Sequence, residues 1–174
     1  MQNDLTLLSD WDGKATQYLI NFYQNNLHLF QKDKRILLDL LKDPTLQRAT
    51  SWLIKHHREQ GNHFSPTEVK AIIQAAPFLQ DWQAQLHLLQ LLPYFNLERE
   101  DFEVLIPFID QMLKSDNKFV RAWAYNGLAI LTRFIPELFP ETKLRFELGL
   151  QEEAASIKAR IRKAIKEQEL DIPY

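Results

Sequence analysis

The residues with the most obvious chemical potential are three histidines that lie close together in the sequence, His56, His57 and His63. Imidazole is a common zinc ligand, but a zinc site needs several side chains that point at one metal ion. Adjacent residues of a helix point about 100° apart, and no carboxylate completes a triad at a suitable spacing. We therefore interpret the histidines as a surface cluster at a helix end, and we predict neither a metal nor a cofactor.

Other signatures of catalysis are missing from the sequence. There is no cysteine, which removes disulfides, thiolate metal sites and cysteine nucleophiles together. No glycine-rich phosphate loop, nucleophile elbow or HExxH motif occurs. The densest acidic run, residues 98–103, is typical of a first helical turn, where the helix dipole favours carboxylates. We predict no catalytic residue and a protein that is not an enzyme.

Composition indicates a packed helical protein. Of the 174 residues 45% are hydrophobic and only four are glycine, so the chain has a core but few tight turns. The formal net charge of −2 provides no overall field that would attract nucleic acid or an anionic membrane. The chain has no apolar run of membrane-spanning length and does not start like a signal peptide, so we expect one folding unit in the cytoplasm.

Several residues mark where helices begin and end. Ser65 is placed as an N-cap, Pro66 follows at the first helical position, and Glu68 is spaced to bond back to the cap. The pair Asp43-Pro44 ends one predicted helix and Gly61 ends the next. Helices are expected over residues 14–30, 32–42, 45–60, 66–79, 81–95, 98–113, 118–138, 141–150 and 154–168.

Every second predicted helix carries a repeated pattern. The clearest copy, residues 116–128, consists of an acidic turn, the pair Val120-Arg121, and then Ala124 and Leu128 on one helix face. Alignment on Val120 places Leu46, Trp82 and Ile157 at equivalent anchor positions, spaced by 36 to 38 residues. A period of this length predicts helix pairs that bury their apolar stripes by stacking on their neighbours.

Residues 116–128 resemble the second helix of a HEAT repeat, and residues 105–109, Leu-Ile-Pro-Phe-Ile, resemble the first helix, in which a proline often bends the chain. The chain therefore resembles the HEAT/armadillo family over residues 32–168, in particular a short HEAT-repeat protein of bacterial type. The resemblance implies an all-α fold, an αα-superhelix (right-handed solenoid) of about four HEAT-like helix pairs with an N-terminal capping helix at 14–30. The implied repeats are 32–60, 66–95, 98–138 and 141–168, within a single domain of residues 1–174.

The resemblance also implies a binding surface, because second helices line the inner, concave face of HEAT-like arrays. Counting from the anchors, the side opposite the core is apolar in the two middle copies and basic in the outer ones. We predict a docking groove for a protein partner. Its candidate residues are Arg48, Trp52, His87, Leu88, Leu91, Arg121, Ala122, Tyr125 and Asn126. Alternatively, the N-terminal helix, a sharper superhelical curl or the mate of a homodimer covers this groove.

Enzymes of similar architecture provide competing functions. HEAT-like iron hydroxylases use His-Glu pairs, which this sequence lacks, and no pigment-binding motif of the phycobilin lyases is present. HEAT-like glycosylases for alkylated DNA bases need aromatic side chains on a basic surface. Trp52, Trp123 and Tyr125 supply the aromatics, but the near-neutral charge argues against nucleic acid. Residues 158–166 are basic but are flanked by glutamates, which favours a solvated capping face.

The predicted function is thus a non-catalytic protein–protein interaction scaffold. Nucleic-acid binding or repair of alkylated bases is the alternative, and a subunit that self-associates through its groove is a third hypothesis.

Overall fold

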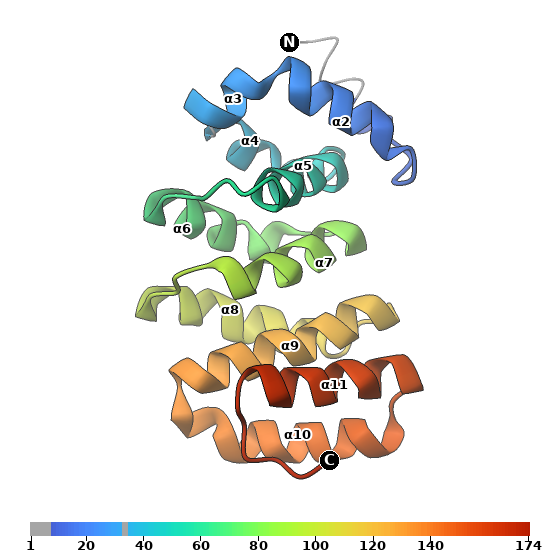
Figure 1. Ribbon diagram of the computed structural model, residues 1–174, viewed down its shortest axis with the longest axis vertical. Helices are drawn as coiled ribbons and strands as arrows, with labels where there is room; N and C mark the ends of the chain where they lie inside the picture. Colours follow the sequence, from blue (N-terminus) through green and yellow to red (C-terminus); the bar gives the residue numbers. More distant parts are fainter. Residues whose placement is uncertain (1–7, 33–34) are drawn as a thin grey trace. The chain divides into compact units, whose positions relative to one another are not determined.

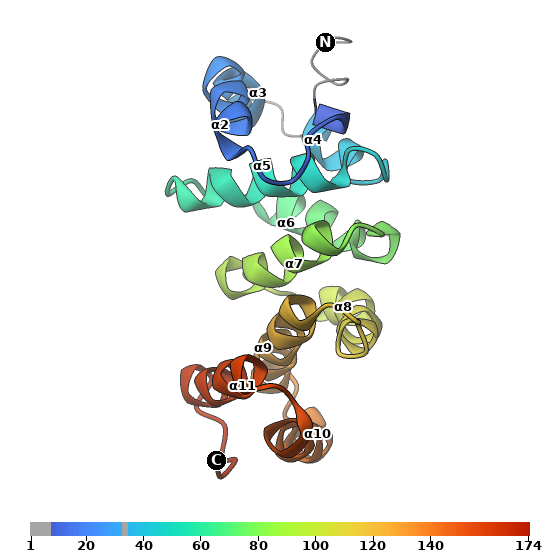
Figure 2. The same cartoon turned by 90° about the vertical axis from the view of Figure 1, so that its right-hand side faces the viewer.

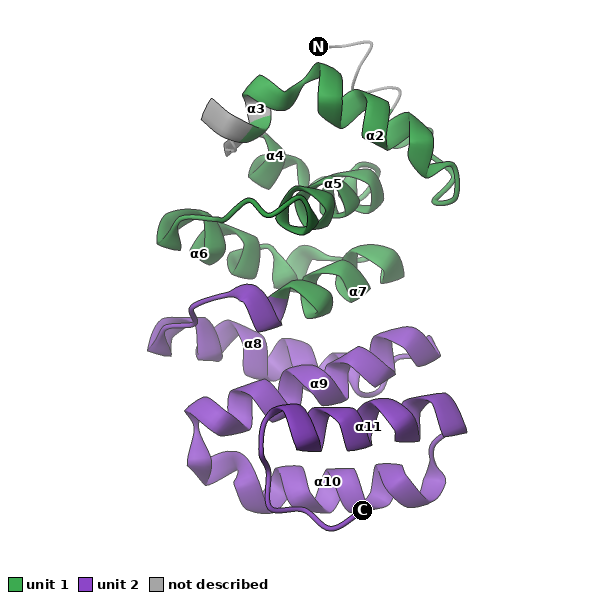
Figure 3. Cartoon of the chain, in the orientation of Figure 1, with its two compact units in different colours: residues 1–91 green, residues 92–174 purple. Residues whose placement is uncertain are grey.

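Prolines and short loops divide the chain into helices that pack against one another. A computed structural model describes residues 8–32 and 35–174, and the described part contains helices and no strand. The all-α prediction is therefore confirmed. The predicted domain and first repeat include residues 1–7, Asp33 and Lys34, which lie outside the described residues. The chain forms two compact units, residues 1–91 (unit 1) and 92–174 (unit 2), as Figure 3 shows.

Unit 1 is built around the contact between two second helices, α5 and α7. Helix α4 packs against α5 and also against α6, so that first helices contact first helices and second helices contact second helices. Figures 1 and 2 show α5 lying between α2 and α7. The elements of unit 1 are α2 (Thr16–Asn25), α3 (Leu27–Lys32), α4 (Arg35–Leu40), α5 (Gln47–Glu59), α6 (Pro66–Gln74), the 3-10 helix η1 (Ala76–Phe78) and α7 (Trp82–Leu91).

Unit 2 is built around the contact between α9 and α11 and contains two further helix pairs. Helix α9 packs along α11, and α8 and α10 pack against α9 and α11 respectively. Short 3-10 turns at Pro93 and Pro136 follow α7 and α9, because proline has no N–H to continue a helix. The elements of unit 2 are η2 (Leu92–Tyr94), α8 (Arg99–Met112), α9 (Lys118–Phe134), η3 (Pro136–Leu138), α10 (Phe139–Glu152) and α11 (Ala155–Glu167).

Side-chain caps fix several of these helix starts. The capping box predicted at Ser65 is confirmed: the Glu68 amide donates to Ser65 Oγ at 3.3 Å, and the Ser65 amide donates to the Glu68 carboxylate at 2.7 Å. Asn117 Oδ1 accepts from the amide of Phe119 at 2.9 Å at the start of α9. At the acidic start of α8, the Glu98 amide donates to Asp101 at 2.8 Å. The acidic run therefore serves a helix N-terminus, as expected.

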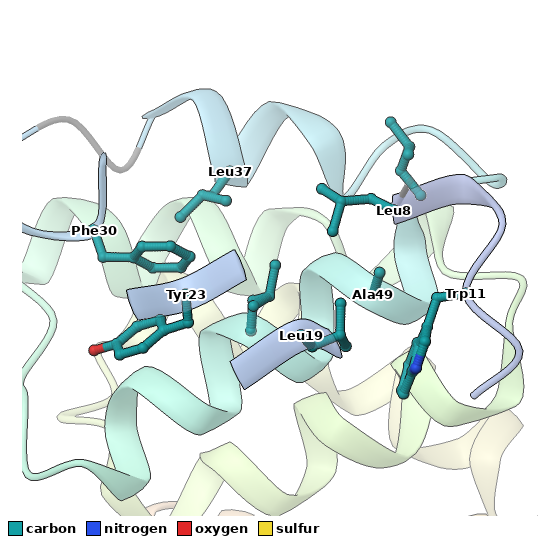
Figure 4. Packing of buried hydrophobic residues seen from close by; sticks show 9 residues of the cluster. Leu8, Trp11, Leu19, Tyr23, Phe30, Leu37 and Ala49 are labelled. Atoms are coloured by element: carbon teal, nitrogen blue, oxygen red, sulfur yellow. The ribbon is translucent and has the colours of Figure 1, made fainter. Parts of the chain in front are cut away.

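The predicted capping helix 14–30 is two helices, α2 and α3, which lie over α5. Their apolar side chains form a core together with Leu8 from the segment before α2, Leu37 of α4 and Ala49 of α5 (Figure 4). Leu19 and Phe30 are almost completely buried in it. This segment therefore covers α5, the second helix of the first predicted repeat.

Burial of the anchor positions corrects the alignment of the repeats. Leu46, Val120 and Ile157 are buried, as the alignment requires, but Trp82 is 40% exposed. Ala84, two residues later, is completely buried and occupies the anchor position of α7. The anchors are thus 46, 84, 120 and 157, and the assignment of Trp82 is wrong.

A small residue permits close packing within the third helix pair. A Cβ atom on Gly127 of α9 would lie 2.9 Å from Ile109 Cδ1 of α8, closer than van der Waals contact. The absence of a side chain at Gly127 therefore lets α8 and α9 approach closely.

Candidate interaction site

The nine residues of the predicted groove are divided between the two units, and most of them are not on the surface. In unit 1, His87, Leu88 and Leu91 are buried, whereas Arg48 and Trp52 are partly exposed. In unit 2, Tyr125 and Asn126 are buried, whereas Arg121 and Ala122 are partly exposed. The prediction of an open apolar centre is therefore wrong for five of its nine side chains.

Leu88 and Leu91 belong to the core of unit 1. Both line a cavity of about 10 Å³ between α5, α6 and α7, which has room for about one water molecule. With Ala84 as the anchor, Leu88 and Leu91 occupy the same repeat positions as Ala124 and Gly127 in α9, which are also buried. A shift of two residues turns a helix by about 200°, so the error in alignment exchanged the inner and outer faces of α7.

His87 is buried at the contact between α5 and α7. Its Nδ1 lies 2.9 Å from Ser51 Oγ of α5, and Ser51 Oγ also donates to the carbonyl of Arg48 at 3.1 Å. Burial lowers the pKa of His87 to about 4; nearby Lys55 adds to this effect and Asp81 opposes it. His87 is consequently neutral at physiological pH and holds two helices together.

Arg48 and its neighbour Gln47 tie the start of α5 to the loop before α7. Arg48 Nε donates to Asp81 Oδ2 at 3.0 Å, and Asp81 also caps α7 by accepting from the amides of Gln83 and Ala84. The buried Gln47 side chain donates to the Phe78 carbonyl at 2.7 Å. Its Oε1 accepts from the backbone amides of Gln80 and Asp81. Arg48, which was predicted to bind a protein partner, is thus paired with Asp81 of unit 1.

Trp52 lies between two other rings. It stacks on His56 with ring centroids 4.7 Å apart and planes 13° from parallel, and it contacts Trp11 at 6.2 Å. Burial lowers the pKa of His56. Its neighbour His57 is buried, and Tyr23 Oη lies 2.8 Å from His57 Nδ1. The interpretation of the histidines as a surface cluster is wrong for His57, which joins α5 to α2.

The described polar groups near the start of unit 1 are not arranged as a metal or ligand site. Among the described residues, no group of three or more His, Cys, Asp or Glu side chains is arranged to hold a metal ion. An open hollow of about 260 Å³ is lined by Asp10, Trp11, Asp12, Ala15 and Tyr18. Its polar groups serve the local fold: Asp12 accepts from the amides of Lys14 and Ala15, which lowers the pKa of Asp12, and the Trp11 indole donates to the Ala15 carbonyl.

In unit 2, Tyr125 is directed from α9 into the contact with α10. Its ring meets Phe146 edge-on, with centroids 5.5 Å apart. A Cβ atom on Gly149 would lie 2.6 Å from the Tyr125 hydroxyl, so only glycine fits there without displacement. Burial raises the pKa of Tyr125. Tyr125 is therefore a packing residue.

Arg121 joins the start of α9 to the loop before α11. It donates from Nε and Nη2 to the two carboxylate oxygens of Glu153, at 3.0 and 3.1 Å, and from Nη1 to the Ser115 carbonyl at 2.7 Å. The hydrogen bond to Glu153 raises the pKa of Arg121. Arg121 of α9 and Gln47 of α5 follow their anchors by one residue and make equivalent connections to the next helix pair.

Comparisons of the chain with protein-family models, with curated proteins and with solved structures found no match. The resemblance to HEAT repeats therefore remains a prediction from the sequence.

The contacts show what the predicted groove positions do within the units. Arg48 and Ser51 of α5 bond to Asp81 and His87 of the next pair, and Tyr125 of α9 contacts α10 of the next pair. Arg48, Ser51 and Tyr125 thus face the following helix pair and connect it to the preceding one, rather than lining an open groove.

The last second helix, α11, differs because the same positions are exposed there. Ala159, Arg162, Lys163 and Lys166 are all exposed, whereas the anchor Ile157 and Ile161 are buried. Beside them, the Arg160 guanidinium lies over the Trp123 ring at 4.0 Å. Within the residues that the structure describes, no helix is long and apolar enough to cross a membrane. The basic side of α11 is the part of the predicted basic ends that is open to solvent.

Proposed function

We propose that this protein is a non-catalytic scaffold of HEAT type, which binds a protein partner on its second helices. The observation that carries the proposal is the repeated junction, in which Gln47 and Arg121 connect equivalent positions to the next helix pair. Repeats stacked in this way form an extended surface, which such proteins use for binding. The right-handed superhelix predicted from the sequence is part of the same proposal.

The polar side chains of the predicted groove support a structural use of those residues. Each of the three side chains is hydrogen-bonded to a neighbouring helix or loop: His87 to Ser51, Arg48 to Asp81 and Arg121 to Glu153. Among the predicted groove residues, Ala122 is partly exposed and makes no such bond, and the equivalent side of α11 is exposed. We propose that a partner contacts these residues, so the groove of the sequence prediction is replaced by a smaller surface.

Photo-crosslinking of the full chain in cells that express it naturally tests this proposal. A benzophenone amino acid replaces Ala122 in one variant and Ala159 in another; Glu103, an exposed residue of the first helix α8, is replaced in a control variant. We expect a discrete crosslinked protein from at least one second-helix position and none from Glu103. Crosslinks of equal yield from all three positions, or from none, would contradict the proposal.

Nucleic-acid binding or repair of alkylated bases is the second candidate function, and the basic side of α11 favours it. The aromatic residues proposed for this role do not support it: Tyr125 is buried, Trp123 lies beneath Arg160, and Trp52 lies between Trp11 and His56. An aromatic side chain that holds a flipped or unstacked base must present an open ring face. Fluorescence anisotropy with DNA at low salt separates the two candidates, since the scaffold is expected to leave the DNA unbound.

A further inference from the structure

One face of α11 is left unpartnered in unit 2. We name it the basic face and define it as Ala159, Arg162, Lys163 and Lys166, all of which are exposed. These residues lie opposite a core stripe that includes Ile157, Ile161 and Ile165. Spacings of three and four residues bring the basic face into one continuous line along the helix.

By position, the basic face corresponds to surfaces that bind helices elsewhere in the protein. The equivalent residues of α9 are Ala122, Tyr125, Asn126 and Ala129, and the last three are buried. Tyr125 lies against Phe146 of the next pair. In α5, the equivalent Ser51 bonds to His87 of the next second helix. The basic face of α11 therefore occupies the position at which α9 and α5 contact the next helix pair.

Its charge differs from that of the other copies. Residues 155–167 contain five Lys and Arg residues and one Glu. Two of these cations are already engaged, since Arg160 lies over Trp123 and Lys158 donates to the Gln151 carbonyl. Lys163 is 3.5 Å from Glu167 in a solvent-exposed pair. Arg162 and Lys166, one turn apart, have no acidic partner among the described residues. They are available to carboxylates of another molecule.

Small side chains lie beside these cations. Ala155 and Ala159 are exposed on the first half of α11, one turn apart. The distance between packed helices depends on the side chains at the contact, so alanines permit close approach. A helix placed along α11 would contact alanines at the N-terminal half of α11 and cations at its C-terminal half.

Resting on the scaffold function proposed above, we infer that the basic face binds an acidic α-helix of a partner protein, laid along α11. Carboxylates one turn apart on that helix would pair with Arg162 and Lys166, and small or apolar residues would pack on Ala159. The guanidinium fork of Arg162 matches a carboxylate. Glu152, Glu167 and Glu169 are exposed around the face, which disfavours the continuous phosphates of a nucleic acid.

A titration followed by nuclear magnetic resonance tests this inference with defined probes. The isotope-labelled full chain is mixed with a synthetic amphipathic peptide of about 18 residues, composed of Ala, Leu and Glu with glutamates one turn apart. The same peptide with Lys in place of Glu is the matched probe, and a thymidine oligonucleotide is the third. We expect the acidic peptide alone to move amide signals of residues 155–167, less strongly as salt is raised.

Two double variants with the same change in net charge show which surface binds the acidic peptide. R162E/K166E reverses two cations of the basic face, whereas K114E/R133E reverses two exposed cations of unit 2 elsewhere. We expect the first to weaken peptide binding by about tenfold and the second to change it by less than about twofold. Circular dichroism confirms that both variants remain helical.

Three results would overturn the inference: no shift with the acidic peptide, equal weakening in both double variants, or the oligonucleotide moving the same signals at lower concentration. The crosslinking experiment keeps the two proposals separate. A partner crosslinked through Ala122 but not Ala159, together with a failed titration, would overturn the acidic-helix inference and leave the scaffold function supported.

Discussion

The junction between α5 and α7 and the junction between α9 and α10 involve equivalent positions of the predicted repeat but are held by different chemistry. In unit 1 the position five residues after the anchor is Ser51, which is hydrogen-bonded to His87. In unit 2 it is Tyr125, which packs on Phe146 and leaves room only for Gly149. The same position thus contacts the second helix of the next pair through a hydrogen bond in unit 1 and the first helix of the next pair through ring packing in unit 2. The first junction should respond to protons and the second to added volume.

Acidification should produce the largest difference between the two junctions. The pKa of His87 is about 4 in the folded state, below its usual value near 6.5, so folding favours the neutral form. This stabilisation is fully present above pH 6.5 and is lost as the pH falls towards 4. At 1.36 kcal/mol per pKa unit, the loss is about 3 kcal/mol. Hydrogen exchange of α5 and α7 against α9 and α11, followed from pH 7 to pH 4, measures it.

The variant H87Q is the matched control for this prediction. Glutamine keeps a polar side chain within reach of Ser51 but does not titrate, so the pH dependence of exchange in α5 and α7 should become flatter. If wild-type and H87Q proteins lose protection in α5 and α7 equally on acidification, His87 is not the cause.

Added volume should affect the second junction by a smaller amount. In G149A the new Cβ meets the Tyr125 hydroxyl at 2.6 Å and Tyr125 Cζ at 2.9 Å, in a buried site. Overpacking costs about 1–3 kcal/mol, of which the better helix propensity of alanine offsets up to about 1 kcal/mol. We expect a net destabilisation of about 2 kcal/mol, measured by urea unfolding. The double variant Y125F/G149A should recover part of the loss, and strict additivity would contradict the proposed clash.

Arg48 in unit 1 and Arg121 in unit 2 should differ in how much each contributes to the free energy of unfolding. Arg121 and Glu153 are mostly buried, and their bond is bidentate, so R121A should destabilise the protein by about 1.5 kcal/mol. The side chain of Arg48 is 38% exposed, and water screens its pair with Asp81. R48A should therefore cost less than about 1 kcal/mol. Urea unfolding of both variants tests this order, and a larger effect at Arg48 would contradict it.

The sequence was sufficient to predict most of the helices. Proline, asparagine and the capping box at Ser65 act locally, so helix limits could be read without tertiary contacts. The register of α7 could not be read in this way, because Trp82 and Ala84 are both apolar and both fit a periodic stripe. Only burial distinguishes them, and burial depends on the neighbouring helices.

The candidate site was harder to predict because its residues find their partners one repeat away. Ser51 and His87 are 36 residues apart, two fewer than the 38 residues between the anchors Leu46 and Ala84, so they are not equivalent positions of the predicted repeat. The sequence pattern alone therefore did not pair them. For Tyr23 and His57 no periodic signal exists either, since Tyr23 belongs to the segment before the first helix pair.

Substitution of a second glycine, Gly127, by alanine should have the smallest effect on stability. It tests whether added volume alone destabilises the protein. In G127A the new Cβ would also be close to a neighbour, at 2.9 Å from Ile109 Cδ1. That atom is the end of a flexible aliphatic side chain, which can shift, whereas Tyr125 at Gly149 is a rigid ring held by Phe146. The gain in helix propensity, up to about 1 kcal/mol, should nearly cancel the cost of the shift. Urea unfolding should thus place G127A within about 0.5 kcal/mol of the wild type. A loss as large as that of G149A would mean that any added methyl group is rejected, and the rigidity of Tyr125 would then not explain the second junction.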